Sequence, residues 1–579
     1  MGKAGLVFVV LLMQVGLALG QELPKVLPED NPHAWTLANT LYPSAKVCGA
    51  CHPNQFKQWS NSSHAYANVS PMFNKFEQKI NDLASGTIGH FCVRCHASVG
   101  TALGERRDIA WWKRAPASQE GITCVSCHRV GEGYGKVNAA RRITPGDIHE
   151  PVFGPFETSG GVKAISNAMK YKILVSPDVA DKPGYLRIHQ AAIQSDLLTQ
   201  SEFCVTCHQV QVHPGIKLET VWEEYRASPA AKEGITCQEC HMSTNPGLPV
   251  GYARGPAAIV NGYTVNNDRP LTDHTFVGPG YPISHPGLFP FRLEESPFTP
   301  EQWLTFDYRA KWGSDEFERS GSGGATLPPE WQNAADRRKA WQIIQENYVR
   351  WRERKEQRQR LLNNASRLDG PFFKGPPTVG RAFAFDYKIT NKNKGHNLPS
   401  GSLGAQPELW LNVALIDPDG KIVWESGYVD SHGDVADLQS FDVQKGLIAH
   451  DDQLVSMQAK FITTNVKGTD REMYLPINLD VDQRPFIRPG GTPTSLLNHP
   501  PLARMEKRSI PPLGTRVAKY KVPAGRITKP GKYRLAARLR GRTEPIYFMV
   551  FVDSTRDMIR SENEWADDTH AYLVEFDVR

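Results

Sequence analysis

The chain has 579 residues and a mass of 64.6 kDa, with 40% hydrophobic and 22% charged residues. This composition excludes a polytopic membrane protein, a collagen-like repeat and a wholly disordered chain. A formal net charge of +6 is small for this length, so charge gives no case for nucleic acid as a partner.

The N-terminus has the pattern of a secretory signal peptide over residues 1–20. A basic start at Lys3 precedes an apolar run from Gly5 to Leu19, and Ala18 and Gly20 form a small-x-small cleavage site. The alternative is an uncleaved membrane anchor, but the run is shorter than the roughly 20 residues that a spanning helix needs. We therefore expect an exported protein of the periplasm or cell surface, with no membrane span after cleavage.

All ten cysteines fall into five copies of C-x-x-C-H, with none left over. The copies are Cys48, Cys51 and His52; Cys92, Cys95 and His96; Cys124, Cys127 and His128; Cys204, Cys207 and His208; and Cys237, Cys240 and His241. This motif attaches c-type haem, because two thiols bond the two vinyl groups of one porphyrin and the following histidine ligates the iron.

Disulfides, zinc sites and a thioredoxin-like motif are the competing interpretations of paired cysteines. None of them requires a histidine after each pair, and a thioredoxin-like motif occurs once. Five complete copies therefore predict five covalently bound haem c groups, each with its motif histidine as the proximal iron ligand.

Two motif pairs are internal repeats. Residues 91–96 lead to Glu120–His128, and residues 203–208 lead to Glu233–His241, with E-G-I-T-C-x-x-C-H at the end of each. A repeated two-haem unit implies a repeated haem-to-haem geometry.

Further histidines are needed as distal ligands if every haem is bis-histidine. Local context favours five of them: His64, His149, His189, His274 and His396. His90 and His213 are rivals for this role. We interpret the others as surface or core residues: His33, His285, His432, His450, His499 and His570.

The hydrophobic pattern predicts a mixed fold in three parts after the signal peptide. Residues 21–295 form a pentahaem domain of short helices and loops, because all the motifs lie there and Gly and Pro are frequent. Residues 296–369 form a helical connector, whose helix over 329–364 follows apolar positions spaced three to four residues apart. Residues 370–579 form an antiparallel β-sandwich.

The β prediction rests on apolar residues that alternate with small or polar ones. The predicted strands include residues 383–389, 409–415, 422–424, 533–539, 546–552 and 572–578. Within the connector, residues 350–360 hold six basic and two acidic side chains. We interpret them as a solvated helix face, with a docking patch for an acidic partner as the alternative.

The segment from Cys48 to His64, with Trp59, and the duplicated E-G-I-T-C-x-x-C-H stretch resemble the multihaem cytochrome c superfamily over about residues 40–280. This group includes hydroxylamine oxidoreductase, its tetrahaem electron acceptor and the pentahaem nitrite reductases. Residues 395–399 are similar to a segment of larger multihaem cytochromes with a C-terminal β domain. The resemblance implies closely packed haems, mostly bis-histidine, with an open site where there is catalysis.

The sequence also departs from the enzymes of this group. Pentahaem nitrite reductases carry a lysine-ligated catalytic haem and hydroxylamine oxidoreductases have eight haems, whereas this chain has five motifs that all end in histidine. The first functional hypothesis is therefore a carrier of single electrons between a redox-protein donor and an acceptor, with no catalytic residues.

Two alternatives stay open at this point. One is a reductase or oxidase of a small inorganic nitrogen or sulfur substrate at a five-coordinate haem. The other is a subunit of a cytochrome filament. A membrane-associated redox complex and a homo-oligomer are both compatible with the sequence.

Overall fold

The computed structural model describes residues 41–579 apart from 84–85, 87, 107, 132–137, 140, 156–188, 190–191, 213–215, 281–284, 289–296, 321–325, 402–405, 439, 459, 463–503 and 507. The expected signal peptide lies outside the described residues, as do His33, His213 and His499. None of the helices in the described part of the chain combines the length and the hydropathy that a membrane span requires.

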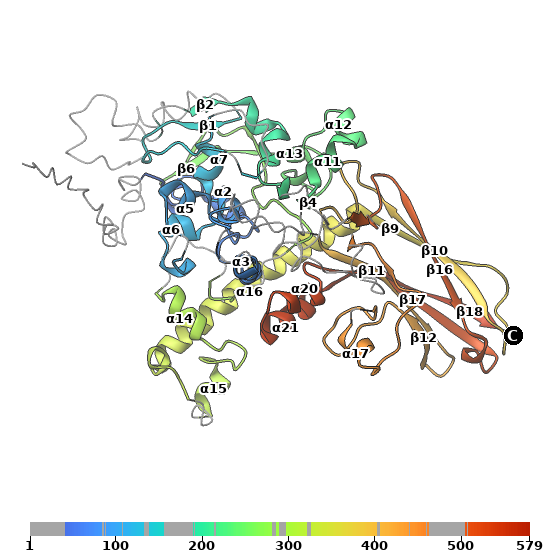
Figure 1. The fold of residues 1–579 in the computed structure, drawn as a ribbon. Coiled ribbons are helices and arrows are strands. Elements are labelled where there is room, and N and C mark those ends of the chain that lie inside the picture. The colour runs from blue at the N-terminus through green and yellow to red at the C-terminus, as the bar shows by residue number, and fades with distance from the viewer. Residues whose placement is uncertain are drawn as a thin grey trace, which may run out of the picture.

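The N-terminal half is built from short helices and two-stranded ribbons (Figure 1). The helices are α1 (Ala45–Gly49), α2 (Pro53–Ser60), α3 (Pro71–Leu83), α4 (Val93–His96), α5 (Ser98–Leu103), α6 (Pro116–Gln119), α7 (Cys124–His128), α10 (Glu202–Val205), α11 (Val221–Arg226), α12 (Pro229–Lys232) and α13 (Cys237–His241). The ribbons are β1 (Val152–Gly154) with β2 (Ala192–Gln194), β3 (Val210–Val212) with β4 (Ile216–Glu219), β5 (Ala253–Gly255) with β8 (Arg269–Leu271), and β6 (Ala258–Val260) with β7 (Tyr263–Val265).

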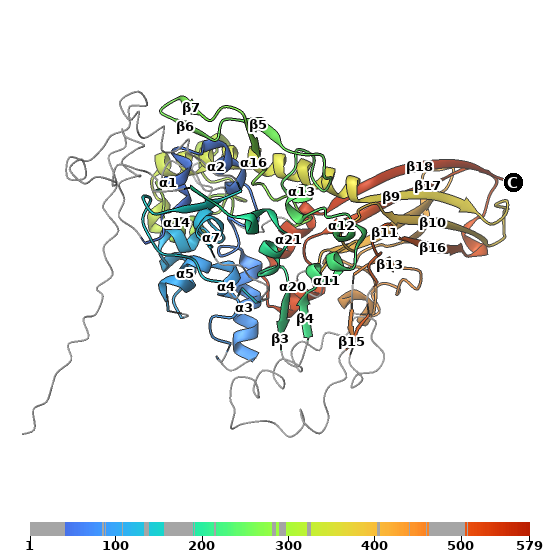
Figure 2. The same cartoon turned by 90° about the horizontal axis from the view of Figure 1, so that it is seen from above.

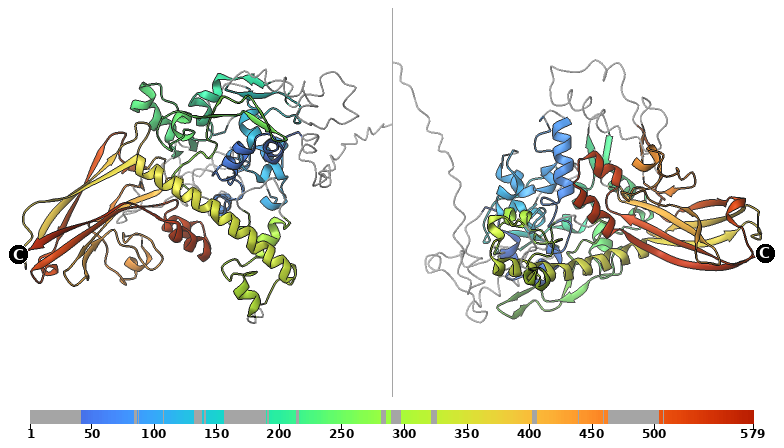
Figure 3. Two further views of the ribbon diagram at one scale, coloured as in Figure 1. Left: turned by 180° about the vertical axis from the view of Figure 1, so that it is seen from behind. Right: turned by 90° about the horizontal axis from the view of Figure 1, so that it is seen from below.

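One long helix, α16 (Ala334–Ala365), runs from the α14 (Pro300–Thr305) and α15 (Asp315–Arg319) region past the N-terminal half to the sheets (Figures 1, 2 and 3). Asn333 caps its start, where the side-chain oxygen accepts a hydrogen bond of 2.9 Å from the Ala335 backbone. An aromatic cluster that includes Trp303, Trp331 and Phe306 packs against its first turns. This helix agrees closely with the one predicted over 329–364.

The C-terminal half contains two antiparallel sheets. The first has the order β16-β10-β9, from β16 (Thr515–Val522), β10 (Phe383–Asn391) and β9 (Ser366–Phe373). The second has the order β12-β11-β17-β18, from β12 (Ile422–Ser426), β11 (Glu408–Ile416), β17 (Gly531–Arg542) and β18 (Asp567–Val578), with β13 (Val455–Ser456) also paired to β11. A small separate ribbon joins β14 (Lys460–Ile462) to β15 (Arg504–Glu506).

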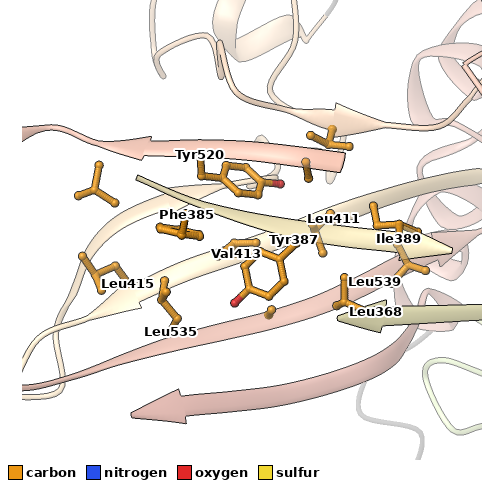
Figure 4. Packing of buried hydrophobic residues seen from close by; sticks show 14 of the residues in the cluster. Leu368, Phe385, Tyr387, Ile389, Leu411, Val413, Leu415, Tyr520, Leu535 and Leu539 are labelled. Atoms are coloured by element: carbon orange, nitrogen blue, oxygen red, sulfur yellow. The ribbon is translucent and has the colours of Figure 1, made fainter. Parts of the chain in front are cut away.

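A single apolar core lies between these two sheets (Figure 4). Phe385 and Tyr520 are register partners in the first sheet, and Leu411 and Leu539 are register partners in the second. All four side chains are buried in the same cluster. The period-two alternation of β10 therefore places its apolar side chains on one face, as the sequence predicts. The expected boundary at 369/370 falls inside β9, which begins directly after α16.

One predicted strand is wrong. Residues 546–552 form the helix α20 (Ile546–Phe551), which is followed by α21 (Arg556–Trp565). Pro545 precedes the first turn, and the buried Ile546, Phe548 and Met549 pack on apolar side chains of α3 in the N-terminal half. A short continuous apolar run suits a buried helix as well as a strand, so contact with α3 decides between them.

The basic stretch of α16 is also not simply a solvated face. Arg354 and Arg358 are 4% and 2% exposed, whereas Arg352 and Arg360 are exposed. The buried face of α16 therefore continues through two arginines before it reaches Leu361 and Leu362.

Candidate haem-binding sites

Each C-x-x-C-H motif sits on one tight helical turn. The backbone N–H of His52 donates to the Cys48 carbonyl over 2.9 Å, and that of His208 donates to Cys204 over 3.0 Å. This turn brings the two cysteines and the following histidine to one side of the backbone. None of the ten cysteines forms a disulfide, so each motif offers two thiols for thioether bonds.

Four of the motif histidines donate their Nδ1–H to a backbone carbonyl. His52 donates to Ala257 over 2.9 Å, and the other three bonds join His96 to Ala67, His128 to Phe153 and His241 to Val277, over 2.9, 2.7 and 3.0 Å. This bond selects the tautomer whose Nε2 carries the lone pair. Each of these imidazoles is therefore oriented to ligate a metal through Nε2.

Four motif histidines face a second histidine across a nearly constant gap. The ring centroids of His52 and His189 are 6.5 Å apart, and three further pairs are His64 with His208, His128 with His274, and His241 with His396, at 6.3, 6.4 and 6.1 Å. Two imidazole nitrogens that each bond one iron at ~2 Å put their ring centres about 6 Å apart. The four gaps therefore fit an iron atom between the rings.

Three of the buried histidines that face a motif histidine are held in the neutral form that can ligate a metal. Burial, followed by the charge of nearby histidines and arginines, lowers the pKa of His64 and of His189 to about 3. Burial likewise lowers the pKa of His274 to about 4. These rings are neutral at pH 7, and His274 also donates its Nδ1–H to the Thr272 carbonyl over 2.9 Å.

His396 reaches its partner from the C-terminal half of the chain. Its backbone N–H donates to the Asn393 side chain over 3.0 Å, and its Nδ1–H donates to the Asn397 carbonyl over 2.9 Å. The buried carboxylate of Glu224 on α11 accepts from the Asn397 backbone and the Ser400 hydroxyl, over 3.2 and 2.7 Å. These bonds connect the His396 loop to the N-terminal half of the chain.

The second motif differs from the other four. The ring of His96 stacks on that of Phe73 with centroids 3.9 Å apart and planes within 7°. Within the part of the chain that the structure describes, no histidine is paired with His96 across an iron-sized gap.

The structure places the remaining candidate histidines as follows. His149 lies within electrostatic reach of His189, beside the first histidine pair, and its distal role stays a prediction. His90 uses its Nε2 in a hydrogen bond of 3.0 Å with the Glu105 carbonyl. In His285 both ring nitrogens are engaged, with Phe306 and Gly287, as in an ordinary core histidine.

The motifs also lie close to one another. Thiols of different motifs come within hydrogen-bonding reach in three pairs, which are Cys48 with Cys124, Cys95 with Cys207, and Cys204 with Cys237. Cys127 lies within electrostatic reach of Cys207. The first motif thus lies next to the third, and the third lies next to the fourth. The fourth motif also lies next to the second and the fifth, so all five motifs form one connected group.

The first copy of the repeated Glu-Gly-Ile-Thr segment joins the third motif to the first motif and to His64. The buried Glu120 carboxylate accepts from the Ala45 backbone and the Thr123 hydroxyl, both over 2.8 Å, so it joins the third motif to the first. Gly121 has φ +66, and a Cβ there would lie 2.5 Å from the His64 carbonyl oxygen. This close approach fixes His64 beside the third motif.

Comparison with known proteins adds a family match over the first three motifs. The family described as cytochrome c554 and c-prime matches residues 47–129. The chain is a multihaem c-type cytochrome. No curated protein matches the chain.

Two solved structures are similar to this multihaem cytochrome to different degrees. A penta-haem cytochrome c552 from Thermochromatium tepidum is 14% identical, with a TM-score of 0.48, over 92% of this chain and 98% of that chain. An alkylpurine DNA glycosylase from Pseudomonas fluorescens, bound to DNA with an abasic site analogue, is 9% identical with a TM-score of 0.12, over 46% of this chain and 42% of that chain. Neither likeness is strong enough to support a functional argument.

Sequence patterns alone do not show that buried arginines of α16 contact the N-terminal half of the chain. Arg354 donates to the Asn61 carbonyl and the Ser63 hydroxyl, over 2.7 and 2.6 Å, and Arg358 donates to the Pro279 carbonyl. Their spacing after Trp351 continues the buried period of the helix, which is the signal that could have shown them.

Proposed function

We propose that this cytochrome is an exported pentahaem carrier of single electrons. Each C-x-x-C-H motif binds one haem c, and four irons take a second imidazole from His189, His64, His274 and His396. The observation that supports this best is that four of the five motif histidines each lie 6.1–6.5 Å from a second buried imidazole, a gap that fits an iron atom between two ring nitrogens.

The bound haems supply reversible one-electron chemistry at iron, and the chain holds and tunes them. The Nδ1–H bonds to backbone carbonyls orient the motif imidazoles and raise their basicity. Burial keeps water from the rings. The short steps between motifs support a continuous route for electrons between a redox-protein donor and an acceptor. This transfer needs no acid, base or nucleophile from the chain.

Three measurements on the protein purified from its exported form test this proposal. The haem-to-protein ratio, from a pyridine haemochrome assay and intact mass, is expected to be five. The mature N-terminus is expected at Gln21. Film voltammetry is expected to show five one-electron centres. A ratio of four or fewer, or fewer redox centres than bound haems, contradicts the proposal.

The second motif favours a further function, the binding of a small inorganic nitrogen or sulfur compound at one haem. Its iron would have His96 as the proximal ligand, with the ring of that histidine held by Phe73. The described residues place no second histidine opposite His96, and we propose that the sixth position of this iron takes an outside ligand.

Optical and EPR titration of the ferric protein tests this second function. We expect a high-spin signal from one haem, lost when one equivalent of cyanide binds, and a similar change with nitrite or hydroxylamine. A ferric protein that is wholly low-spin and unchanged by all three compounds excludes it. The same titration of a His96→Met variant, in which the proximal ligand is altered, shows whether the responding haem is that of the second motif.

A further inference from the structure

Three arginines of α16 are buried, and one of them differs from the other two. Arg337 pairs with the Glu318 carboxylate, with Nε 2.7 Å from Oε1, and Arg358 pairs with Asp567 over 2.7 Å. Arg354 is 4% exposed, and none of the described carboxylates lies within ion-pair distance of it. Its charge is therefore buried without a compensating anion from these residues.

The partners of Arg354 are all uncharged. Nη1 donates to the Asn61 carbonyl over 2.7 Å, and Nη2 donates to the Ser63 hydroxyl and the Gly280 carbonyl, over 2.6 and 3.2 Å. Nε has no hydrogen-bond partner although it is buried. Burial and then the charge of Arg358 lower the pKa of this guanidinium to about 10, which still leaves it protonated at pH 7.

These contacts bring the uncompensated charge next to one haem site. Ser63 directly precedes His64, the imidazole that faces His208 across 6.3 Å. Both Arg354 and Arg141 act electrostatically on His64. Arg141 also lies among the thiols of the second, third and fourth motifs, and its Nε is buried without a partner. Two cations thus converge on the fourth haem site.

We propose that Arg354 raises the reduction potential of the haem held between His64 and His208, while its hydrogen bonds position His64. Reduction of ferric to ferrous iron adds one electron and no proton at this site. A buried positive charge stabilises that added negative charge, and the weak screening of the interior makes the effect large. The fourth haem, which adjoins the second, third and fifth motifs, is then the site where electrons collect before they leave.

This inference rests on the proposed haem sites, so the test includes a variant that checks them separately. In His64→Met, the low-spin EPR signal of one haem is expected to change, which assigns that signal to the fourth haem. An unchanged spectrum refutes the axial role of His64 itself. In the wild-type holoprotein, potentiometric titration should then show that the assigned haem has the highest potential of the low-spin haems.

The charge is tested with Arg354→Gln, Arg354→Lys and Arg352→Gln in the holoprotein. Arg352 lies exposed on the same helix, so Arg352→Gln removes the same charge from a position in contact with solvent. For Arg354→Gln we expect the ratio of reduced to oxidised fourth haem, at a fixed applied potential, to fall about tenfold, which is a shift of about 59 mV for one electron. Arg354→Lys should keep most of the potential, because it keeps the charge.

Several outcomes overturn the inference. These are an unchanged potential in Arg354→Gln with the low-spin spectrum intact, an equal shift in Arg352→Gln, or a loss in Arg354→Lys as large as in Arg354→Gln. If Arg354→Gln does not fold, the wild-type titration and Arg354→Lys decide, since a fourth haem that is not the highest in potential is incompatible with the proposal.

Discussion

His241 and His396 face each other with ring centroids 6.1 Å apart and planes within 14°, although one belongs to a haem motif and the other to the loop after β10. The two halves of the chain therefore also meet at one of the proposed iron sites. The β-rich half contributes no cysteine, but it completes the coordination proposed for the fifth haem.

Replacement of His396 by alanine is expected to convert one haem from low-spin to high-spin, because the imidazole opposite His241 is removed. The measurement is low-temperature EPR of the ferric protein. Added imidazole should restore the low-spin signal by entering the vacated space. His432→Ala, at an exposed histidine in the same half, is the control and should change nothing. A normal low-spin spectrum in His396→Ala would show that His396 is not a ligand.

Gly121→Ala is expected to disturb the fourth haem site. A Cβ at Gly121 would lie 2.5 Å from the His64 carbonyl oxygen, and φ +66 is strained for alanine. Gly234 occupies the same position of the second repeat with φ +73, but a Cβ there meets nothing within 4 Å. We expect the EPR signal assigned to the fourth haem to broaden or shift in Gly121→Ala and to stay normal in Gly234→Ala. If the two variants change the EPR signal equally, backbone strain explains the change and the contact with His64 does not.

Glu219 is expected to make the stability of the protein pH-dependent. Burial and then the nearby Glu224 raise the pKa of this carboxyl from 4.5 to about 8. The folded protein thus keeps a proton that the unfolded chain has released, so stability falls as the pH rises from about 4.5 to 8, by at most about 1.4 kcal/mol per pH unit. Urea unfolding across this range should show a flatter dependence in Glu219→Gln. A pH slope identical to that of the wild type would exclude Glu219 as its source.

Arg337→Gln is expected to destabilise the protein by about 3–5 kcal/mol, because it leaves the Glu318 carboxylate buried without its cation. The two side chains are only 6% and 5% exposed. Arg337 also holds the pKa of Glu318 below its usual range, so this stabilisation is present above about pH 4.5 and is lost as the pH falls. Arg338→Gln removes an exposed charge and should cost little. Chemical unfolding at pH 7 compares the two, and equal losses would contradict the prediction.

Local patterns in the sequence were sufficient for the features that depend on chain neighbours. The C-x-x-C-H spacing is local chemistry, and the period of α16 and the alternation of β10 follow from which face of each element is buried. The apolar run 546–552 was misassigned for the same reason, since a local pattern does not say what the run packs against.

The tertiary structure decided which histidine faces which motif. His64 follows the first motif but faces His208 of the fourth, while the first motif faces His189. Chain distance carries no information on such pairs, because ligands meet only when separate segments fold together. Likewise, the basic residues of α16 look alike in the sequence. Only packing buries Arg354 beside His64 and leaves Arg352 in solvent, and that burial turns an ordinary charge into one able to tune a haem.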